Sequence, residues 1–245
     1  MKQTDMSRKI LEQARERLDQ AVEIAALTGA GISAESGVPT FRGADGLWRQ
    51  HRMEDLATPE AFQRDPRLVW TWYNWRRALI ADKTPNPGHL ALARLERLKP
   101  AFQLITQNVD GLHQLAGSRN LLEIHGSIWR VRCTVCGQRR IERNTLANPP
   151  SCPACQGLLR PDVVWFGEAL ATDRLDAAFR AVSQAEVLLV VGTSGLVQPA
   201  ASLAWQAKRS GAWILEINIE PTPFSEHADA VLPGPAGRIL PQLLP

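Results

Sequence analysis

The apolar positions of the chain follow two patterns, which alternate from one end to the other. Short continuous apolar runs predict buried strands at residues 24–27, 102–106, 121–124, 187–191 and 213–217. Apolar residues at helical spacing predict helices at residues 6–20, 68–79, 89–97, 174–185 and 200–210. Strands that alternate with helices are typical of a mostly parallel α/β sheet, whose ligands bind at the carboxyl ends of the strands.

Residues 128–166 break this alternation, because they contain all four cysteines, several prolines and glycines, and little periodicity. Such a segment is typical of a small module inserted in a larger fold. The pattern therefore predicts a discontinuous α/β domain at residues 1–127 and 167–245, with a small domain inserted at residues 128–166.

Composition and charge narrow the class of protein. The chain has 245 residues, of which 44% are hydrophobic and 22% are charged, as in ordinary globular proteins. No apolar stretch approaches the roughly 18 residues that a membrane helix needs, so we expect no membrane partner. Residues 1–20 lack an apolar signal and carry acidic residues, which favours a cytoplasmic protein. The net charge of +3 comes from dispersed basic residues, so we expect no specific nucleic-acid binding.

The four cysteines form two Cys-x-x-Cys pairs with residues 137–151 between them, a spacing typical of zinc sites. Four thiolates complete a tetrahedron and leave no open position, so the ion would be structural rather than catalytic. Two disulfides or an iron–sulfur cluster are the alternatives, and a reducing compartment favours zinc. The predicted ligands of one zinc ion are Cys133, Cys136, Cys152 and Cys155.

The segment from Gly29 to Ala34 fits the loose dinucleotide pattern Gly-x-Gly-x-x-Gly/Ala and follows a predicted strand. Glycines permit close backbone approach to a pyrophosphate, and a helix N-terminus supplies hydrogen-bond donors. A hydride-transferring dehydrogenase would next need a second strand that ends in an acidic residue about 20 positions on. Residues 36–55 instead form a polar, glycine-rich stretch, either a functional lid or a plain turn followed by a disordered loop.

Two polar features allow more than one interpretation from the residues alone. His125 lies between apolar Ile124 and Gly126, where a histidine is either a packed core residue or a general base. Residues 107–110 follow a predicted strand with amide and carboxylate side chains. Such side chains suit either a turn cap or the hydroxyls and carboxamide of a ligand.

Five segments together carry a resemblance to a known family: GAGISAESGVPTFRG at 29–43, TQNVDGLH at 106–113, EIHG at 123–126, FGE at 166–168 and GTS at 192–194. They resemble the signature blocks of the sirtuins, which are NAD-dependent protein-lysine deacylases. The blocks follow the family's order and flank the cysteine module where the family has it. The resemblance implies a Rossmann-like parallel-sheet domain with a small inserted zinc-ribbon domain. NAD and acyl-lysine protein substrates would meet in the cleft between the two.

The resemblance also implies a mechanism. The acyl-lysine carbonyl oxygen attacks the nicotinamide ribose and displaces nicotinamide, His125 takes a proton from the ribose hydroxyls, and the 2′-hydroxyl captures the acyl group. The products are free lysine, nicotinamide and O-acyl-ADP-ribose. Asn108 joins His125 as a predicted catalytic residue, and Phe41 is expected to cover the reacting sugar and exclude water.

The other residues that the resemblance implicates fall into two groups. Those expected to contact NAD are Gly29, Ala30, Gly31, Ser33, Phe41, Arg42, Trp48, Gln107, Asn108, Val109, Asp110, Gly192, Thr193, Ser194, Asn218, Ile219, Glu220 and Ala236. Those expected to pair with the substrate peptide, which would add a strand, are Val163, Val164, Trp165 and Phe166.

Tyr73 and Arg76 lie three residues apart, on one face of the helix predicted at 68–79. A phenol and a guanidinium that converge on an apolar pocket suit a terminal carboxylate, although such a pair usually just extends along the surface of an amphipathic helix. The pair resembles the mark of class III sirtuins, which remove succinyl, malonyl and glutaryl groups. Ala34 resembles a small pocket-lining residue of that class. Arg77 points about 100° further round the helix than Arg76.

Two rival functions differ in how well the sequence excludes them. ADP-ribosyl transfer shares the displacement of nicotinamide with deacylation and differs only in the acceptor, so the sequence barely separates the two. A zinc-ribbon binding module would need a basic stripe, which the dispersed charges do not provide.

Overall fold

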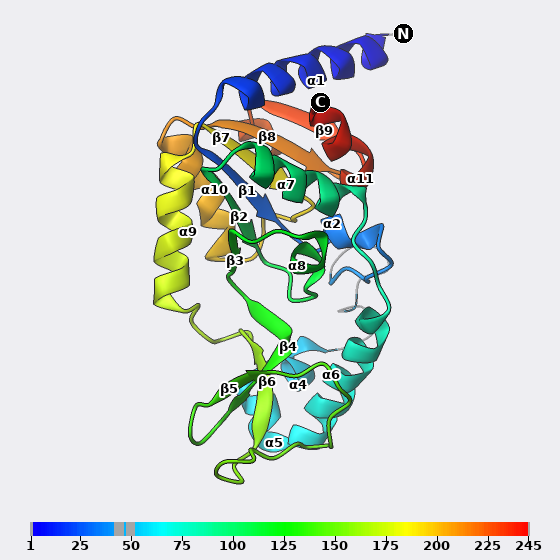
Figure 1. Cartoon of the computed structure of the whole chain (residues 1–245), viewed down its shortest axis with the longest axis vertical. Helices are drawn as coiled ribbons and strands as arrows, with labels where there is room; N and C mark the ends of the chain where they lie inside the picture. Colours follow the sequence, from blue (N-terminus) through cyan, green and yellow to red (C-terminus); the bar gives the residue numbers. More distant parts are fainter. Residues whose placement is uncertain (1, 42–46, 48–51, 245) are drawn as a thin grey trace.

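The computed structural model describes residues 2–41, residue 47 and residues 52–244, with side chains from residue 8 onward. It consists of a larger α/β part, which carries both ends of the chain, and a smaller part that contains a second sheet (Figure 1).

The larger part is built on a six-stranded sheet with the strand order β3-β2-β1-β7-β8-β9. All neighbouring strands of this sheet run parallel. Its strands are β1 (Ile24–Thr28), β2 (Phe102–Thr106), β3 (Leu121–Glu123), β7 (Val187–Val191), β8 (Trp213–Asn218) and β9 (Ala230–Pro233). The predicted α/β fold class is therefore confirmed, and the short edge strand β9 is the one strand of this sheet that the apolar pattern missed.

Helices cover both faces of the parallel sheet, so its central strands are apolar on both sides and appear in the sequence as continuous runs. One face is covered by α1 (Lys2–Gln20), α7 (Pro87–Leu98), α11 (Ala236–Ile239) and η2 (Leu240–Leu243). The other face is covered by α9 (Thr172–Gln184) and α10 (Ala200–Arg209). Three short turns of helix follow strands or loops: α2 (Gly31–Ala34), α8 (Leu112–Ala116) and η1 (Ser225–His227).

The smaller part is a three-stranded antiparallel sheet with the strand order β5-β4-β6, covered by helices from earlier in the chain. Its strands are β4 (Gly126–Cys133), β5 (Arg139–Ile141) and β6 (Leu159–Val163), and its helices are α4 (Met53–Leu56), α5 (Pro59–Arg64) and α6 (Pro66–Ala81). These helices and the sheet share one apolar core, in which Trp70 Nε1 donates to Leu159 O at 2.8 Å. Residues 53–81 therefore pack with the inserted segment, although the predicted division at residues 127/128 placed them with the larger domain. That division stays a prediction.

Helix α6 begins where its sequence dictates and presents one buried face to the smaller sheet. Asp65 is the N-cap and accepts a hydrogen bond from Leu68 N at 2.9 Å, and Pro66 occupies the first turn, where its missing N–H costs nothing. The buried residues of α6 are Val69, Trp70, Trp72, Tyr73, Arg76, Arg77 and Ile80. Two arginines thus lie on a face that is otherwise mostly apolar and aromatic.

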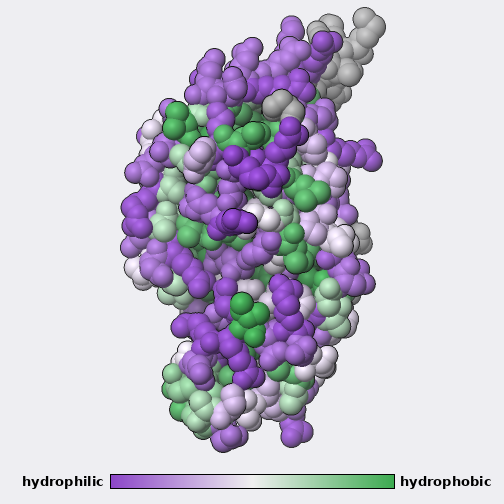
Figure 2. Space-filling view, viewed as in Figure 1, coloured by the Kyte–Doolittle hydropathy of each residue, from purple (hydrophilic) through white to green (hydrophobic). Residues whose placement is uncertain are grey.

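The described helices include none that is long and apolar enough to cross a bilayer. The face of the molecule seen in Figure 2 is mostly hydrophilic, with apolar residues in small separate patches.

Candidate active site

The loops that follow β1 and β7 pack directly on each other at the carboxyl edge of the sheet, because these strands are adjacent and parallel. Gly31 N–H donates to Gly192 O at 2.8 Å, and Gly29 N–H donates to Val191 O at 3.0 Å. A Cβ atom on Gly31 would lie 2.7 Å from Gly192 Cα, so this approach requires glycine. The helix α2 that follows has only four residues, fewer than the dinucleotide pattern suggests.

Ser33, Asn108 and Asp110 form a buried hydrogen-bonded network beside these glycines. Ser33 Oγ donates to the Asp110 carboxylate at 2.8 Å, and Asn108 Nδ2 donates to Gly29 O at 3.0 Å and to Ser33 Oγ at 3.2 Å. Burial raises the pKa of Asp110, while hydrogen bonds from Leu112 N–H and the Ser33 hydroxyl oppose that shift. The network therefore ties the loop after β1 to the loop after β2.

Gln107, Thr193 and Asn218 connect the loops after β2, β7 and β8 in the same way. Gln107 Nε2 donates to Thr193 Oγ1 at 2.9 Å, and Asn218 Nδ2 donates to Thr193 O at 2.9 Å. Ile219, which follows β8, is 67% exposed. Most of the residues predicted to contact NAD thus lie along one edge of the parallel sheet, at strand ends, in the loops that follow them or in α2: Gly29, Ala30, Gly31, Ser33, Gln107, Asn108, Val109, Asp110, Gly192, Thr193, Ser194, Asn218, Ile219 and Glu220. Ala236 begins α11, whose Gly237 N–H donates to Glu35 beside α2.

Two buried histidines, His89 of α7 and His113 of α8, lie against this network and were not among the predicted site residues. Their ring centroids are 4.8 Å apart. His89 Nδ1 accepts from Asn86 N–H at 3.3 Å, so its proton is on Nε2, which lies 3.3 Å from Ser33 Oγ. Burial lowers the pKa of His89 to about 4 and that of His113 well below its ordinary value, so both rings are neutral at pH 7. His89 begins the helix predicted at 89–97, which is the sequence signal for it, whereas no helix was predicted around His113.

His125 lies between the two sheets, immediately before Gly126 begins β4. Its Nδ1 is 3.1 Å from Gln107 O, and because a carbonyl only accepts, Nδ1 carries the proton. Nε2 is then the unprotonated nitrogen that can take a proton from a substrate hydroxyl. Burial lowers the pKa of His125, which keeps this nitrogen unprotonated at neutral pH. The contact with Gln107 thus sets the tautomer that a general base needs.

Residues 163–166 continue from the end of β6 and pass beside His125. Val164 N–H donates to His125 O at 2.9 Å, and Phe166 N–H donates to Ala57 O at 2.9 Å. The side chain of Trp165 is only 3% exposed and points into the core of the smaller part, where its Nε1 donates to the Tyr73 hydroxyl at 2.8 Å. The backbone of this segment therefore lies beside the candidate base, whereas the Trp165 side chain faces away from solvent.

Tyr73 and Arg76 are both buried on the same face of α6, with 3% and 5% of their surfaces exposed. The Arg76 guanidinium carbon lies 4.6 Å from the Phe41 ring centroid and 5.0 Å from the Trp72 ring centroid. Burial lowers the pKa of Arg76, and the nearby Tyr73 and Asp110 raise it. Within the described ranges, no carboxylate forms an ion pair with Arg76 and no acceptor forms a hydrogen bond with it. This arrangement excludes the surface interpretation of the pair.

Arg77, the next residue, is satisfied by the chain itself. Its guanidinium donates to Ile128 O at 2.8 Å, to Glu142 O and to Asn144 O at 2.9 Å, so it braces the smaller sheet. Ala34 is exposed at the end of α2. Three residues of the 36–55 stretch were predicted to contact NAD. Phe41 is described in the structure, whereas Arg42 and Trp48 lie outside the described residues.

The four cysteines gather at one end of the smaller sheet with the geometry that zinc requires. Their Sγ atoms all lie within 4.8 Å of one another, with Cys133 and Cys155 3.4 Å apart and Cys136 and Cys152 3.8 Å apart. A tetrahedral zinc with Zn–S bonds of about 2.3 Å needs S···S separations of about 3.8 Å. Backbone amides of Cys136 and Val135 lower the pKa of Cys133 to about 6, which favours the thiolate. The thiols form no disulfide. The cluster therefore fits one structural zinc ion.

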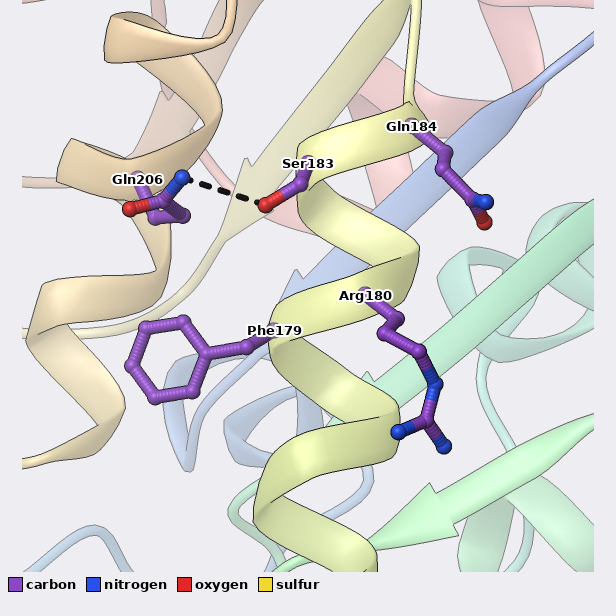
Figure 3. A pocket seen from close by; sticks show the side chains of 5 residues that line it. All are labelled: Phe179, Arg180, Ser183, Gln184 and Gln206. Carbon is purple, nitrogen blue, oxygen red and sulfur yellow. Dashed lines mark hydrogen bonds between the residues drawn. The ribbon is translucent and has the colours of Figure 1, made fainter.

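A surface hollow of about 420 Å³ lies elsewhere, between α9 and α10, and is lined by Phe179, Arg180, Ser183, Gln184 and Gln206. Ser183 accepts a hydrogen bond from Gln206, while Arg180 and Gln184 extend from α9 away from that contact (Figure 3). Because these polar groups do not converge on one point, we place the candidate active site at the edge of the parallel sheet and not in this hollow.

Residues 29–199 match the model of the Sir2 family. The chain belongs to the Sir2 family. It is 57% identical over 210 residues to an NAD-dependent protein deacylase of Aquifex aeolicus, which covers 85% of this chain and 88% of that protein. It is 55% identical over 226 residues to an NAD-dependent protein deacylase of Pyrococcus furiosus, covering 89% of this chain and 90% of that protein.

Solved structures of Sir2 proteins share the whole architecture. A Sir2 homologue in complex with ADP-ribose superposes with a TM-score of 0.92 at 48% identity, covering 95% of this chain and 94% of that one. A Sir2 homolog–NAD complex gives a TM-score of 0.89 at 49% identity, covering 95% and 91%. A Sir2 protein bound to a myristoylated histone peptide gives 0.78 at 33% identity, covering 96% and 95%.

The site residues of this Sir2 chain fit the groups that NAD presents. Its loops offer amide side chains at Gln107, Asn108 and Asn218, hydroxyls at Ser33 and Thr193, and the carboxylate of Asp110. These are the donors and acceptors that ribose hydroxyls and a carboxamide require.

The cysteine geometry predicts that removing one zinc ligand unfolds the smaller part of the molecule and does not act on a catalytic step directly. Structural zinc contributes roughly 10–16 kcal/mol of apparent binding free energy, so Cys133→Ala should lose the ion and unfold the smaller part. Elemental analysis and thermal melting test this, with the exposed neighbour Ser151→Ala as the control that keeps one zinc per chain. Freshly purified, unchelated wild-type protein without zinc would refute the assignment.

The lowered pKa of His125 predicts how activity depends on pH. Because burial lowers its pKa, we expect His125 to lose its activity as a base only at a pH lower than that at which a free imidazole becomes protonated. We expect His125→Ala to remain folded and to lose about 10²- to 10⁴-fold in turnover. The exposed His227→Ala variant is the matched control and should keep the wild-type profile. An acidic limb centred above pH 7, or near-normal turnover of folded His125→Ala, would reject the role.

Proposed function

We propose that this Sir2-family chain is an NAD-dependent protein-lysine deacylase that removes acetyl groups and also acyl groups that end in a carboxylate, such as succinyl and malonyl. Two lines of support are its relatives of 57% and 55% identity, which are NAD-dependent protein deacylases, and its match to a Sir2 homolog–NAD complex. The products are the deacylated lysine, nicotinamide and O-acyl-ADP-ribose.

Two groups of residues take part in the proposed reaction: those at the edge of the parallel sheet would bind NAD, and His125 would act as the general base. NAD, when bound, supplies the ribose that receives the acyl group and the nicotinamide that leaves. Gln107, Asn108 and Asp110 hold the ribose and the carboxamide, and Phe41 excludes water from the reacting sugar. His125 Nε2 accepts a proton from a ribose hydroxyl while Gln107 O holds its Nδ1 proton. The backbone of residues 163–166 pairs with the substrate peptide beside His125.

The observation that carries the preference for a carboxylate is the buried guanidinium of Arg76, which forms no ion pair with any described carboxylate, although Asp110 lies near enough to raise its pKa. An arginine keeps its charge in proteins, so a buried one needs a compensating group. A succinyl or malonyl carboxylate provides that charge and accepts hydrogen bonds from the guanidinium. Phe41 lies over the guanidinium, so we expect its ring to shift when such an acyl chain enters.

Mass spectrometry of acyl-lysine peptides tests the reaction. Peptides carrying acetyl- or succinyl-lysine should lose the acyl mass only when NAD is present, with one nicotinamide released per peptide. Gain of ADP-ribose mass by the peptide would instead establish the transferase, and loss of the acyl group without NAD would exclude a sirtuin mechanism.

Two neighbouring arginines give a matched test of acyl specificity. Arg76→Met removes a charge-assisted contact of roughly 1.5–3 kcal/mol, so the kcat/KM for succinyl-lysine should fall about ten- to hundredfold, with deacetylation much less affected. Arg77→Met removes bonds to three backbone carbonyls and should lower the melting temperature while keeping the ratio of the two activities. Equal losses on both peptides in Arg76→Met would contradict the carboxylate site.

A further inference from the structure

We propose that Trp165 determines acyl specificity by positioning Tyr73, because its indole N–H fixes the Tyr73 hydroxyl as a hydrogen-bond donor toward the acyl carboxylate. This inference rests on the proposed function, since it concerns the same carboxylate site. Trp165 is a positioning residue in this scheme, and its indole ring acts through Tyr73.

The direction of the hydrogen bond follows from the two groups involved. Trp165 Nε1 lies 2.8 Å from the Tyr73 oxygen, and an indole N–H only donates, so the Tyr73 oxygen accepts. The phenolic proton must then point elsewhere, and none of the described residues accepts it. Tyr73 and Arg76 share one face of α6, and both are buried. A carboxylate, which only accepts, is the group that satisfies a phenol and a guanidinium at once.

The protonation state of Tyr73 agrees with a donor role. Burial raises the pKa of Tyr73, while the nearby Arg76 and the hydrogen bond from Trp165 oppose that rise. The hydroxyl therefore keeps its proton at neutral pH, and that proton is available to an acyl carboxylate.

The Trp165 ring is held on more than one side, so its N–H has a fixed direction. The Arg160 guanidinium carbon lies 3.3 Å from the ring centroid, and the Phe62 ring centroid lies 5.3 Å away. Glu168 holds Arg160 with two charge-assisted bonds of 2.6 and 2.9 Å and also accepts from Trp165 N–H at 2.9 Å. A bidentate ion pair of this kind has little rotational freedom. The Arg160–Glu168 pair therefore braces both the ring and the backbone of Trp165.

A plain packing role for Trp165 is the competing explanation, and substitutions separate the two. Trp165→Phe keeps an aromatic ring and removes the N–H. Trp165→benzothienylalanine keeps the bicyclic shape and replaces the N–H with a sulfur atom that cannot donate, so it tests the proposal even if the phenylalanine variant is poorly folded. The matched control is Trp70→Phe, which removes an indole hydrogen bond to Leu159 O in the same core without touching the Tyr73 hydroxyl.

Steady-state kinetics on succinyl- and acetyl-lysine peptides give the decisive readout. Both Trp165 substitutions should raise the KM for the succinyl peptide about three- to tenfold, with a smaller effect on its kcat, and should lower the succinyl-to-acetyl ratio of kcat/KM. Tyr73→Phe should do the same, and adding Trp165→benzothienylalanine to Tyr73→Phe should lower the ratio no further, because the two act through one hydroxyl. Trp70→Phe should keep the wild-type ratio.

The outcomes distinguish this inference from the function on which it rests. Wild-type enzyme that ignores succinyl-lysine would remove the proposed acyl preference, and the role of Trp165 with it. Wild-type enzyme that removes succinyl groups through Tyr73, but keeps its KM and its ratio when the residue-165 N–H is absent, would overturn the positioning role alone. An additive loss in the double variant would likewise assign Trp165 to packing.

Discussion

Burial of a permanent positive charge is the constraint on which the acyl site depends. The Arg76 guanidinium lies over the rings of Phe41 and Trp72, whose π faces offset part of the cost of removing a guanidinium from water. Its neighbour Arg77 donates instead to three backbone carbonyls. One helix thus carries two buried arginines: Arg77 is bonded to the chain, and Arg76 is the one that we propose binds the acyl carboxylate. Trp72, which holds Arg76 by this ring contact, is part of the aromatic core between α6 and the smaller sheet.

His125, the proposed general base, lies where the two sheets of the molecule meet. His125 Nδ1 contacts Gln107 O on the parallel sheet, and His125 O accepts from Val164 N–H beside the smaller sheet. The residue therefore touches the edge expected to hold NAD and the segment expected to hold the peptide. Its position, its tautomer and its lowered pKa all follow from being held between these two surfaces.

The sequence was most informative about features that depend on the spacing of residues close together in the chain. Continuous apolar runs predicted the central parallel strands, and the spacing of the cysteines predicted a cluster that the structure brings within 4.8 Å. Helical spacing predicted that Tyr73 and Arg76 share a face. The spacing did not reveal that this face is buried, because α4, α5 and α6 pack on a sheet formed more than forty residues later.

Contacts between distant segments were beyond the sequence pattern. Trp165 and Tyr73 are 92 residues apart, and Arg77 reaches carbonyls 51 to 67 residues away. The histidines at 89 and 113 are neutral because tertiary packing buries them, against each other and against Ser33 and Thr28. Residue type and spacing indicate which groups are available, whereas tertiary packing decides which of them remain without a partner.

We propose that Arg76 receives its counter-charge from the acyl group. A comparison of succinyl-lysine with succinamyl-lysine, in which a carboxamide replaces the carboxylate at nearly the same size, tests this claim on the unmodified enzyme. We expect kcat/KM to be at least about tenfold higher for the peptide with the carboxylate, because the carboxamide loses a charge-assisted contact. Equal kcat/KM for the two peptides would show that the charge of the acyl group is not recognised, and would contradict the proposed pairing of Arg76 with the acyl carboxylate.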